Sequence, residues 1–370
     1  MKGKTILVSL TVVFLSITAS ANTYRPVIDL GPGTAYSIND NGLIVGVSGG
    51  HACLFDSTGG ANTDLGTLGG SQSCAYSINN NGKIVGAAEN TGQHACLFDP
   101  SGAGNNKDLG DLGPIGSMGS ACAYSINNND HIVGWASNGS GFQRACLFDN
   151  TGNGNNKDLG TLWAPYQFGA IAYSINNNDQ VVGLAQGISV DSRACFFSPS
   201  PGLNTDLGAL GGTQSCAWSI NDNGKIVGDA SIGLSSGVRH ACFFGPLQAN
   251  TDLGTIAGYD YSCALSINDN DQIVGYAVPP VGGFPPQFLP PHACLFDPSG
   301  GGATDLNTLI DPLSGWTLNR ASCINNNGWI VGYGINPDGY THAYLLTPEP
   351  ATLLLFGLGG TVVALRRSRR

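Results

Sequence analysis

The chain has few charged residues. Lysine, arginine, aspartate and glutamate make up 11% of its 370 residues, against about 25% in an average globular protein. Glutamate occurs only as Glu89 and Glu349, so a hydrolase built on paired carboxylates would have to use aspartates. No phosphate-binding loop and no His-Glu-x-x-His motif occurs. These shortages leave no constellation typical of an active site, and we expect no enzymatic activity.

Glycine and apolar residues are plentiful. The chain contains 55 glycines, and apolar residues reach 42%. A disordered chain would have less apolar content. Many short strands joined by tight turns explain this composition, so we predict an all-β fold.

Residues 1–21 have the layout of a secretory signal peptide. Two lysines precede an apolar run over 6–17, and an Ala-Ser-Ala triplet ends at Ala21. A basic start, a short apolar core and an A-x-A site are typical of a cleaved leader. The alternative, an uncleaved membrane helix, would need a longer run. We predict export, with a mature domain over 22–347.

A second signal occupies residues 348–370. Pro348, Glu349 and Pro350 precede an apolar stretch over 351–365 and a basic end with four arginines, which should stay cytoplasmic. This layout resembles the PEP-CTERM sorting signal of Gram-negative bacteria. The resemblance implies recognition by an exosortase, cleavage near the Pro-Glu-Pro motif, and delivery to the cell surface or extracellular matrix. The apolar stretch would contact the membrane at least transiently, and a retained anchor is the alternative outcome.

The mature domain is acidic. Setting aside the two leader lysines, the four tail arginines and Glu349 leaves 9 basic and 24 acidic residues, a net charge of −15. Nucleic-acid binding depends on lysine and arginine neutralising phosphates, so we expect no nucleic-acid partner.

Seven repeats lie between the two signals. Each contains four short segments, named strands A to D: Ser-Ile-Asn (Cys-Ile-Asn in the seventh repeat), Ile-Val-Gly (Val-Val-Gly in the fourth), His or Arg followed by Ala, and Asp-Leu. The isoleucines of strand A are Ile38, Ile78, Ile126, Ile175, Ile220, Ile267 and Ile324. Asn-Gly or Asn-Asp joins strands A and B, which predicts a type I′ hairpin in each repeat.

Repeats of 40 to 57 residues with four strands each are typical of propeller blades. We therefore predict a seven-bladed β-propeller of four-stranded blades. The first Asp-Leu precedes the first Ser-Ile-Asn, and none follows the last strand C. A strand near 27–31 can therefore complete the seventh blade, close the ring and remove an exposed edge.

The repeat sequence also resembles that of the extracellular HAF repeat family. Residues 64–70 (Asp-Leu-Gly-Thr-Leu-Gly-Gly) and 82–86 (Gly-Lys-Ile-Val-Gly) carry the resemblance. His-Ala-Phe has become His-Ala-Cys or Arg-Ala-Cys in six repeats and His-Ala-Tyr in the seventh. The resemblance implies an exported repeat protein and little about its chemistry.

Loop lengths divide the predicted ring into two faces. The A–B loops are constant and the C–D loops nearly so, whereas the B–C and D–A loops on the opposite face vary widely. Function usually lies in variable loops on a fixed scaffold. Candidate residues for stacking on sugars or holding a protein partner are the loop aromatics Trp163, Tyr166, Phe168, Phe284 and Phe288. The alternative is that they cap the blade ends.

The His or Arg of each strand C matches the Asp of each strand D in number. A donor facing a carboxylate on a neighbouring strand explains why Arg can replace His, and Arg does not replace a metal ligand. We predict seven structural pairs, no metal site and no cofactor. The asparagine-rich turns leave calcium as a less favoured alternative.

Eleven cysteines recur at two repeat positions. An exported protein can form disulfides, and pairing each strand-C cysteine with strand A of the next repeat leaves only Cys146 over. The candidate pairs are Cys53–Cys74, Cys96–Cys122, Cys195–Cys216, Cys242–Cys263 and Cys294–Cys323. The alternative is that the cysteines are small buried apolar residues.

These observations favour a structural or adhesive protein of the cell surface or extracellular matrix. The first alternative is a carbohydrate-binding propeller that uses its variable face, with extracellular polysaccharide or surface proteins as partners. A weaker alternative is a polysaccharide-active hydrolase or lyase, for which Asp191, Asp229 and Asp260 on predicted variable-face loops supply acids.

Overall fold

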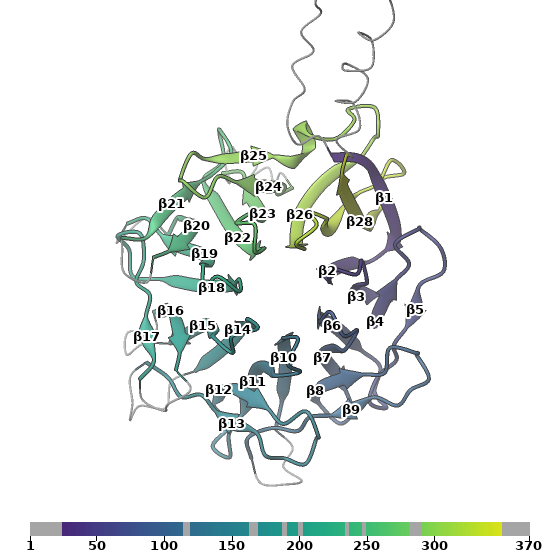
Figure 1. Cartoon of the computed structure of the whole chain (residues 1–370), viewed down its shortest axis with the longest axis vertical. Coiled ribbons are helices and arrows are strands. Elements are labelled where there is room, and N and C mark those ends of the chain that lie inside the picture. The colour runs from purple at the N-terminus through teal and green to yellow at the C-terminus, as the bar shows by residue number, and fades with distance from the viewer. Residues whose placement is uncertain are drawn as a thin grey trace, which may run out of the picture.

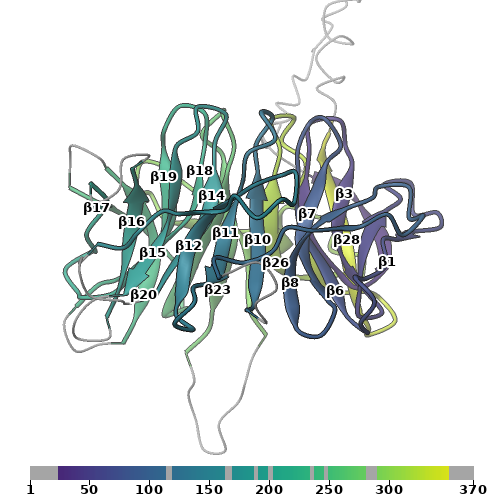
Figure 2. The same cartoon turned by 90° about the horizontal axis from the view of Figure 1, so that it is seen from below.

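Seven four-stranded antiparallel sheets form a ring around a common axis (Figure 1). This computed structural model describes residues 24–113, 119–162, 169–186, 191–198, 203–233, 237–245, 249–280 and 290–349. The predicted all-β, seven-bladed propeller is confirmed. In the side view the blades stand next to one another with their strands running between the two faces (Figure 2).

The strands follow the predicted order from the axis to the rim, strand A being innermost. Blade 1 contains β2 (Thr34–Ile38), β3 (Ile44–Ser48), β4 (His51–Phe55) and β5 (Thr63–Asp64); blade 2 contains β6 (Ser73–Ile78), β7 (Ile84–Glu89), β8 (Gln93–Phe98) and β9 (Lys107–Asp108); blade 3 contains β10 (Ala121–Ile126), β11 (Ile132–Ser137), β12 (Gln143–Phe148) and β13 (Lys157–Asp158). Blade 4 contains β14 (Ala170–Ile175), β15 (Val181–Gln186), β16 (Ser192–Phe197) and β17 (Thr205–Asp206); blade 5 contains β18 (Ser215–Ile220), β19 (Ile226–Ser231), β20 (Arg239–Phe244) and β21 (Thr251–Gly254). Blade 6 contains β22 (Tyr261–Ile267), β23 (Ile273–Val278), β24 (His292–Phe296) and β25 (Ala303–Asp305), which the 3-10 helix η1 (Leu306–Thr308) follows; blade 7 contains β26 (Thr317–Ile324), β27 (Ile330–Ile335), β28 (Thr341–Pro348) and β1 (Tyr24–Pro32).

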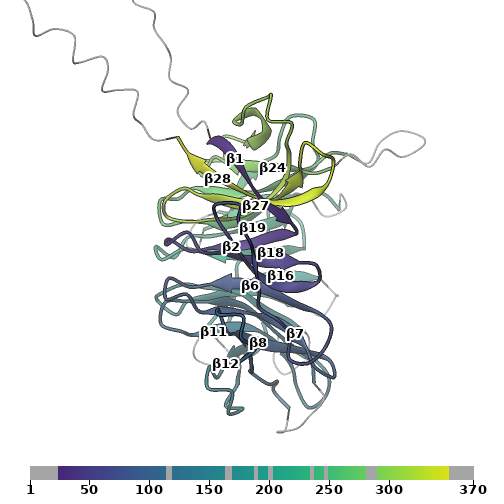
Figure 3. The same ribbon diagram turned by 90° about the vertical axis from the view of Figure 1, so that its right-hand side faces the viewer.

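The N-terminal strand completes the last blade, as predicted. β1 pairs antiparallel with β28, with Val27 opposite Leu346 (Figure 3). Tyr24 pairs with Pro348, so the first residue of the Pro-Glu-Pro motif belongs to the last strand. This pairing leaves blade 7 with the same four strands as the others and gives β28 a partner on both sides.

Apolar side chains fill the space between every two neighbouring blades. Between blades 2 and 3, for example, Val85 and Ala95 meet Ile126, Ile132 and Phe148. The other six junctions hold equivalent clusters. The core is therefore a ring of seven inter-blade layers, and each blade is stable only against its neighbours.

The A–B turns correct one prediction. In the first turn the N–H of Gly42 donates to the carbonyl of Asn39, and only Gly42 has a positive φ, at 81°. A type I′ turn would need positive φ at both central residues. Each hairpin is instead a type I turn followed by one left-handed residue. Asp130, Asp179 and Asp271 take that position in three blades, with φ between 61° and 65°.

Every innermost strand has a bulge two residues before its isoleucine. The register shifts there in all seven blades. The bulge brings a strand-A carbonyl onto the glycine of Ile-Val-Gly: a Cβ on Gly134 would lie 1.9 Å from the carbonyl oxygen of Cys122. The same approach of 1.8 to 2.0 Å occurs in all blades, which explains why this residue is glycine in every repeat.

Replacing that glycine should destabilise the fold strongly. Because the clash is with backbone, we expect Gly134→Ala to lower the free energy of unfolding in urea by about 3 kcal/mol or more. The control is Gly92→Ala, where the added Cβ meets no atom within 4 Å and the change should stay within about 0.5 kcal/mol. Equal losses in the two variants would show that the close approach is unimportant.

Candidate functional site

Asparagines at the end of the innermost strands form a closed ring of hydrogen bonds. Each asparagine of Ser-Ile-Asn donates its Nδ2 to the backbone carbonyl of the equivalent asparagine in the next blade, at 2.8 to 2.9 Å. The members are Asn39, Asn79, Asn127, Asn176, Asn221, Asn268 and Asn325. The last donates to the first, so the ring has no free end.

Two further rings lie beside the first. The backbone N–H of the next residue donates to the side-chain Oδ1 of its counterpart in the following blade, at 2.8 to 2.9 Å. The third residue of each turn, always an asparagine, donates its Nδ2 to a carbonyl of the following blade, at 2.7 to 3.0 Å. Three bonds therefore cross each of the seven junctions at this end of the axis.

Sequence reasoning explained these asparagines by turn formation alone. The turn does use them, because Asn39 Oδ1 accepts the N–H groups of Asn41 and Leu43. It leaves the side-chain Nδ2 free to bond the next blade. The signal that was missed is three successive polar positions in every repeat, where a turn requires fewer.

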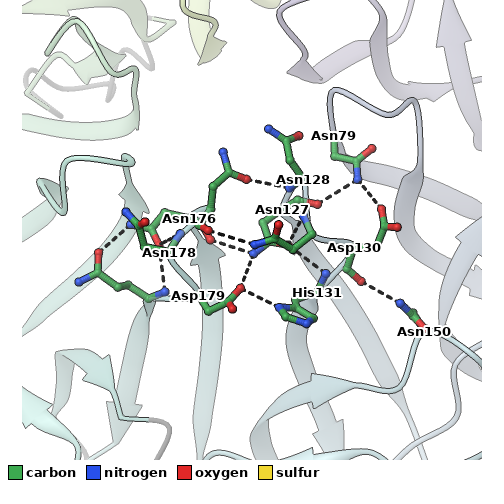
Figure 4. Close-up of polar contacts among 12 residues, drawn as sticks. Asn79, Asn127, Asn128, Asp130, His131, Asn150, Asn176, Asn178 and Asp179 are labelled. Carbon is green, nitrogen blue, oxygen red and sulfur yellow. Dashed lines mark hydrogen bonds and ion pairs between the residues drawn. The ribbon is translucent and has the colours of Figure 1, made fainter.

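The aspartates in three hairpins reinforce their junctions, and Figure 4 shows two of them, Asp130 and Asp179. Asn127 Nδ2 lies 2.7 Å from Asp179 Oδ1, which His131 also contacts through Nδ1 at 2.7 Å. Asn79 contacts Asp130 in the same way. Burial raises the pKa of Asp179, but hydrogen bonds from His131 and Asn127 outweigh it and hold that pKa below its usual value.

The asparagine rings surround an axial pocket of about 180 Å³ that all seven blades line. Besides the ring asparagines, its polar lining includes Asp40, Asn80, Asn128, Asn177, Asp222, Asp269 and Asn326. Neighbouring amides hold its acids: Asp40 Oδ2 accepts from both Asn80 and Asn326. In the described part of the chain, no group of three or more His, Cys, Asp or Glu side chains is placed to hold a metal ion.

A single ring member should matter more than a surface asparagine. Asn127 is 4% exposed, and Asn127→Asp would lose both Nδ2 bonds and place a carboxylate beside Asp179. We expect the free energy of unfolding at neutral pH to fall by about 2 kcal/mol or more. The exposed Asn90 supplies the matched control, Asn90→Asp, with a change within about 0.5 kcal/mol. If the two variants unfold alike in urea, the rings do not hold the blades together.

The predicted His/Arg–Asp pairs are confirmed in all seven blades. Strand C and strand D bring each pair to 2.7 to 3.1 Å. The pairs are His51–Asp64, His94–Asp108, Arg144–Asp158, Arg193–Asp206, His240–Asp252, His292–Asp305 and His342–Asp29. The last pair joins β28 to β1, so it also fastens the ring closure. Their sevenfold repetition gives them a structural role.

The predicted disulfides are not formed: all eleven cysteines are free thiols. Each strand-C cysteine points toward the preceding blade, away from its predicted partner in the following one. Cys53, for example, packs with Leu345 and Val331 of blade 7, whereas Cys74 belongs to blade 2. The same holds for Cys96, Cys195, Cys242 and Cys294, which face away from Cys122, Cys216, Cys263 and Cys323. Burial raises the pKa of Cys53 to about 11 and that of Cys74 to about 12, which makes these thiols unreactive.

The bulges form an aromatic collar on the inner strands. The unpaired bulge residues of blades 1 to 5 are Tyr36, Tyr76, Tyr124, Tyr173 and Trp218, and successive rings lie 4.3 to 5.5 Å apart. Blades 6 and 7 have Leu265 and Ser322 at this position. The collar is therefore open on one side of the axis. The sequence analysis did not single out these residues, because the bulge breaks the alternation of a regular strand.

Asp229 requires a correction. The acid was predicted on a variable loop, but it lies in β19 and is 1% exposed. Its carboxylate accepts from Trp218 Nε1 at 2.6 Å and pairs with Arg239 Nε at 2.6 Å. Asp191 and Asp260 do lie on loops, before β16 and β22. Burial raises the pKa of Asp229, and Arg239 and Trp218 offset this only in part.

This raised pKa makes a prediction about pH. A carboxyl group whose folded pKa exceeds its unfolded value, about 3.9, contributes stability that is present below the unfolded value and lost as the pH rises through the folded pKa. We expect the unfolding free energy of wild type minus that of Asp229→Asn to fall between pH 4 and 8 in urea titrations. A difference that grows with pH would mean that the Arg239 pair outweighs burial.

A hollow of about 330 Å³ opens between blades 1 and 2, on the face of the B–C and D–A loops. Tyr36 and Tyr76 of the collar form one side, and Gln72, Gln93 and Glu89 contribute polar groups. Ser71 donates its N–H and its hydroxyl to Glu89 Oε2, at 3.2 and 2.8 Å. The hollow combines aromatic faces with hydrogen-bonding side chains, as ligand pockets commonly do.

The aromatic candidates predicted from the sequence lie outside the described residues. Trp163, Tyr166 and Phe168 fall in 163–168, and Phe284 and Phe288 fall in 281–289. The leader and Pro350 also lie outside, whereas Pro348 ends β28 and Glu349 follows it. These binding candidates stay predictions.

Comparison with known proteins identifies the C-terminal segment. Residues 346–370 match the family model of the PEP-CTERM protein-sorting motif. The chain carries this sorting motif, as the sequence predicted. The motif implies recognition by an exosortase and export to the surface or the extracellular space. None of the curated proteins compared with the chain matches it.

The propeller resembles a solved structure of a Mycobacterium tuberculosis puromycin-hydrolyzing peptidase, with a TM-score of 0.53 and 12% sequence identity. The match covers 84% of this chain and 49% of the other, so this chain spans about half the length of that protein. At this identity the similarity shows the fold alone. Within the described residues, no helix has the length and apolar character that a membrane crossing requires.

Proposed function

We propose that the chain is an exported, non-enzymatic propeller that serves as a structural and adhesive unit of the cell surface or extracellular matrix. The observation that carries this proposal is the closed set of asparagine rings. Three bonds cross every junction in the same way, and such repetition serves rigidity, whereas catalysis needs a unique constellation. The sorting motif supplies the route to the surface.

The surface chemistry supports the same proposal. A mature charge of −15 favours solubility outside the cell. The raised pKa values of the Cys53 and Cys74 thiols keep them protonated, so they react slowly with oxidants and disulfides outside the cell. HAF-type repeats, cleavage of the leader after Ala21 and transient anchoring through 351–365 belong to this proposal as well.

The test compares matrix cohesion in cells with and without the chain. We expect loss of the chain to lower the shear stress at which the matrix detaches from the cells. In cells that have the chain, we expect to find the protein in the matrix fraction. Replacing Pro348, Glu349 and Pro350 with alanine should keep the propeller intact but leave it with the cells and weaken the matrix equally. A matrix of unchanged cohesion in both strains would contradict the structural role.

Carbohydrate binding is the second candidate function. The hollow between blades 1 and 2 favours it, because aromatic faces beside amides and a carboxylate suit the apolar faces and hydroxyl groups of sugars. Adhesion to a polysaccharide matrix would follow from such binding. A hydrolase or lyase has less support, since the described acid with a raised pKa, Asp229, is buried against Arg239 and Trp218.

A further inference from the structure

We infer that the hollow between blades 1 and 2 is a binding site for uncharged pyranose units of a polysaccharide, with Tyr36 and Tyr76 as its stacking surface. This inference rests on the carbohydrate-binding function proposed above and gives that function a place and a ligand class.

The hollow exists because the side chain at one position of strand B is small. The residue after the glycine of Ile-Val-Gly is Ala87 in blade 2 and Val47 in blade 1, and both line the hollow. The same position holds Trp135, which is 8% exposed and packs against Cys122, in blade 3. Blades 6 and 7 place Tyr276 and Tyr333 there. Ala87 packs toward blade 3, in one cluster with Cys122 and Trp135, and the small side chains of Ala87 and Val47 leave room beside the collar.

The stacking surface is held in place before any ligand arrives. Tyr36 and Tyr76 are bulge residues, so no strand partner competes for their position. Their ring centroids lie 5.5 Å apart with planes inclined by 50°. Each ring is only partly buried. Aromatic faces of this kind combine a large apolar area with little loss of side-chain freedom on binding.

The polar side of the hollow is also fixed. Glu89 accepts two bonds from Ser71 through Oε2, and its backbone N–H donates to the carbonyl of Gln72 at 2.9 Å. The Glu89 carbonyl in turn accepts the N–H groups of Leu68 and Gly70. The D–A loop therefore rests on the end of β7, and Gln72 and Glu89 face the hollow from a braced wall.

Charge selects the ligand class. Among the residues that line the hollow, Glu89 is the one that carries a charge. An anionic sugar would meet this carboxylate and the acidic domain around it. A neutral sugar meets amide and carboxylate groups that bond its hydroxyls, and a hollow of about 330 Å³ is at the lower end of ligand pockets, enough for about one or two sugar rings.

Two natural substitutions between repeats supply variants that should fold. Ala87→Tyr copies the residue of blades 6 and 7 and fills the hollow, and Tyr76→Leu copies Leu265 of blade 6 and removes one stacking face. Leu184→Tyr and Tyr173→Leu introduce the same residues at the equivalent positions of blade 4, outside the hollow, and serve as matched controls. Thermal unfolding of all four variants verifies that they are folded.

The experiment measures binding of the exported protein to dextran, galactan and mannan, with alginate as the acidic probe, by affinity electrophoresis and calorimetry. We expect saturable binding to a neutral polysaccharide that Ala87→Tyr and Tyr76→Leu each weaken by about ten-fold or more, while the blade 4 controls bind like wild type. Competition by the methyl glycoside of the same sugar should follow the same pattern.

The possible failures are distinguishable. Neutral-polysaccharide binding that both hollow variants leave unchanged would overturn this site and keep the carbohydrate-binding function. A preference for alginate would overturn the ligand class. Wild-type protein that binds none of the four polysaccharides would overturn the carbohydrate-binding function itself, and the site with it.

Discussion

The amide–carbonyl bond between neighbouring asparagines is the interaction on which the rest of the structure depends. A blade of four short strands buries its apolar faces only against other blades, so the junctions must be held in register. The asparagine side chains do this at the axis, where the strands lie closest together. At the rim the His/Arg–Asp pairs hold strand D to strand C. Blade contacts and strand contacts are thus secured at opposite edges of the sheet.

The bulge links this framework to the proposed ligand site. It forces glycine at one position of strand B, because a strand-A carbonyl approaches too closely for any Cβ. It also turns one residue out of the strand pairing. The same irregularity therefore accounts for an invariant glycine and for the collar of aromatic rings. A small side chain at one neighbouring position, Ala87 in blade 2 where blade 3 has Trp135, then leaves room for the hollow.

Repeat counting predicted the blades, their strand order, the closure by β1 and the seven His/Arg–Asp pairs, because each depends on features that recur in the linear sequence. The asparagine rings, the collar and the hollow were not predicted. The rings depend on which side-chain atoms stay free after the turn has formed, and the collar depends on a bulge that breaks strand alternation. The cysteine pairing failed because repeat spacing does not reveal to which side of a blade a side chain points.

Closure by β1 and β28 has a kinetic consequence. Val27 must find Leu346, a partner almost the whole length of the domain away, and loop closure over such a distance is slow. Until β28 has been added, blade 7 lacks its third strand and the ring stays open, with unsatisfied strand edges at both ends. The pairing also extends to Pro348. Completion of the ring therefore requires the strand that carries Pro348, the first residue of the Pro-Glu-Pro motif.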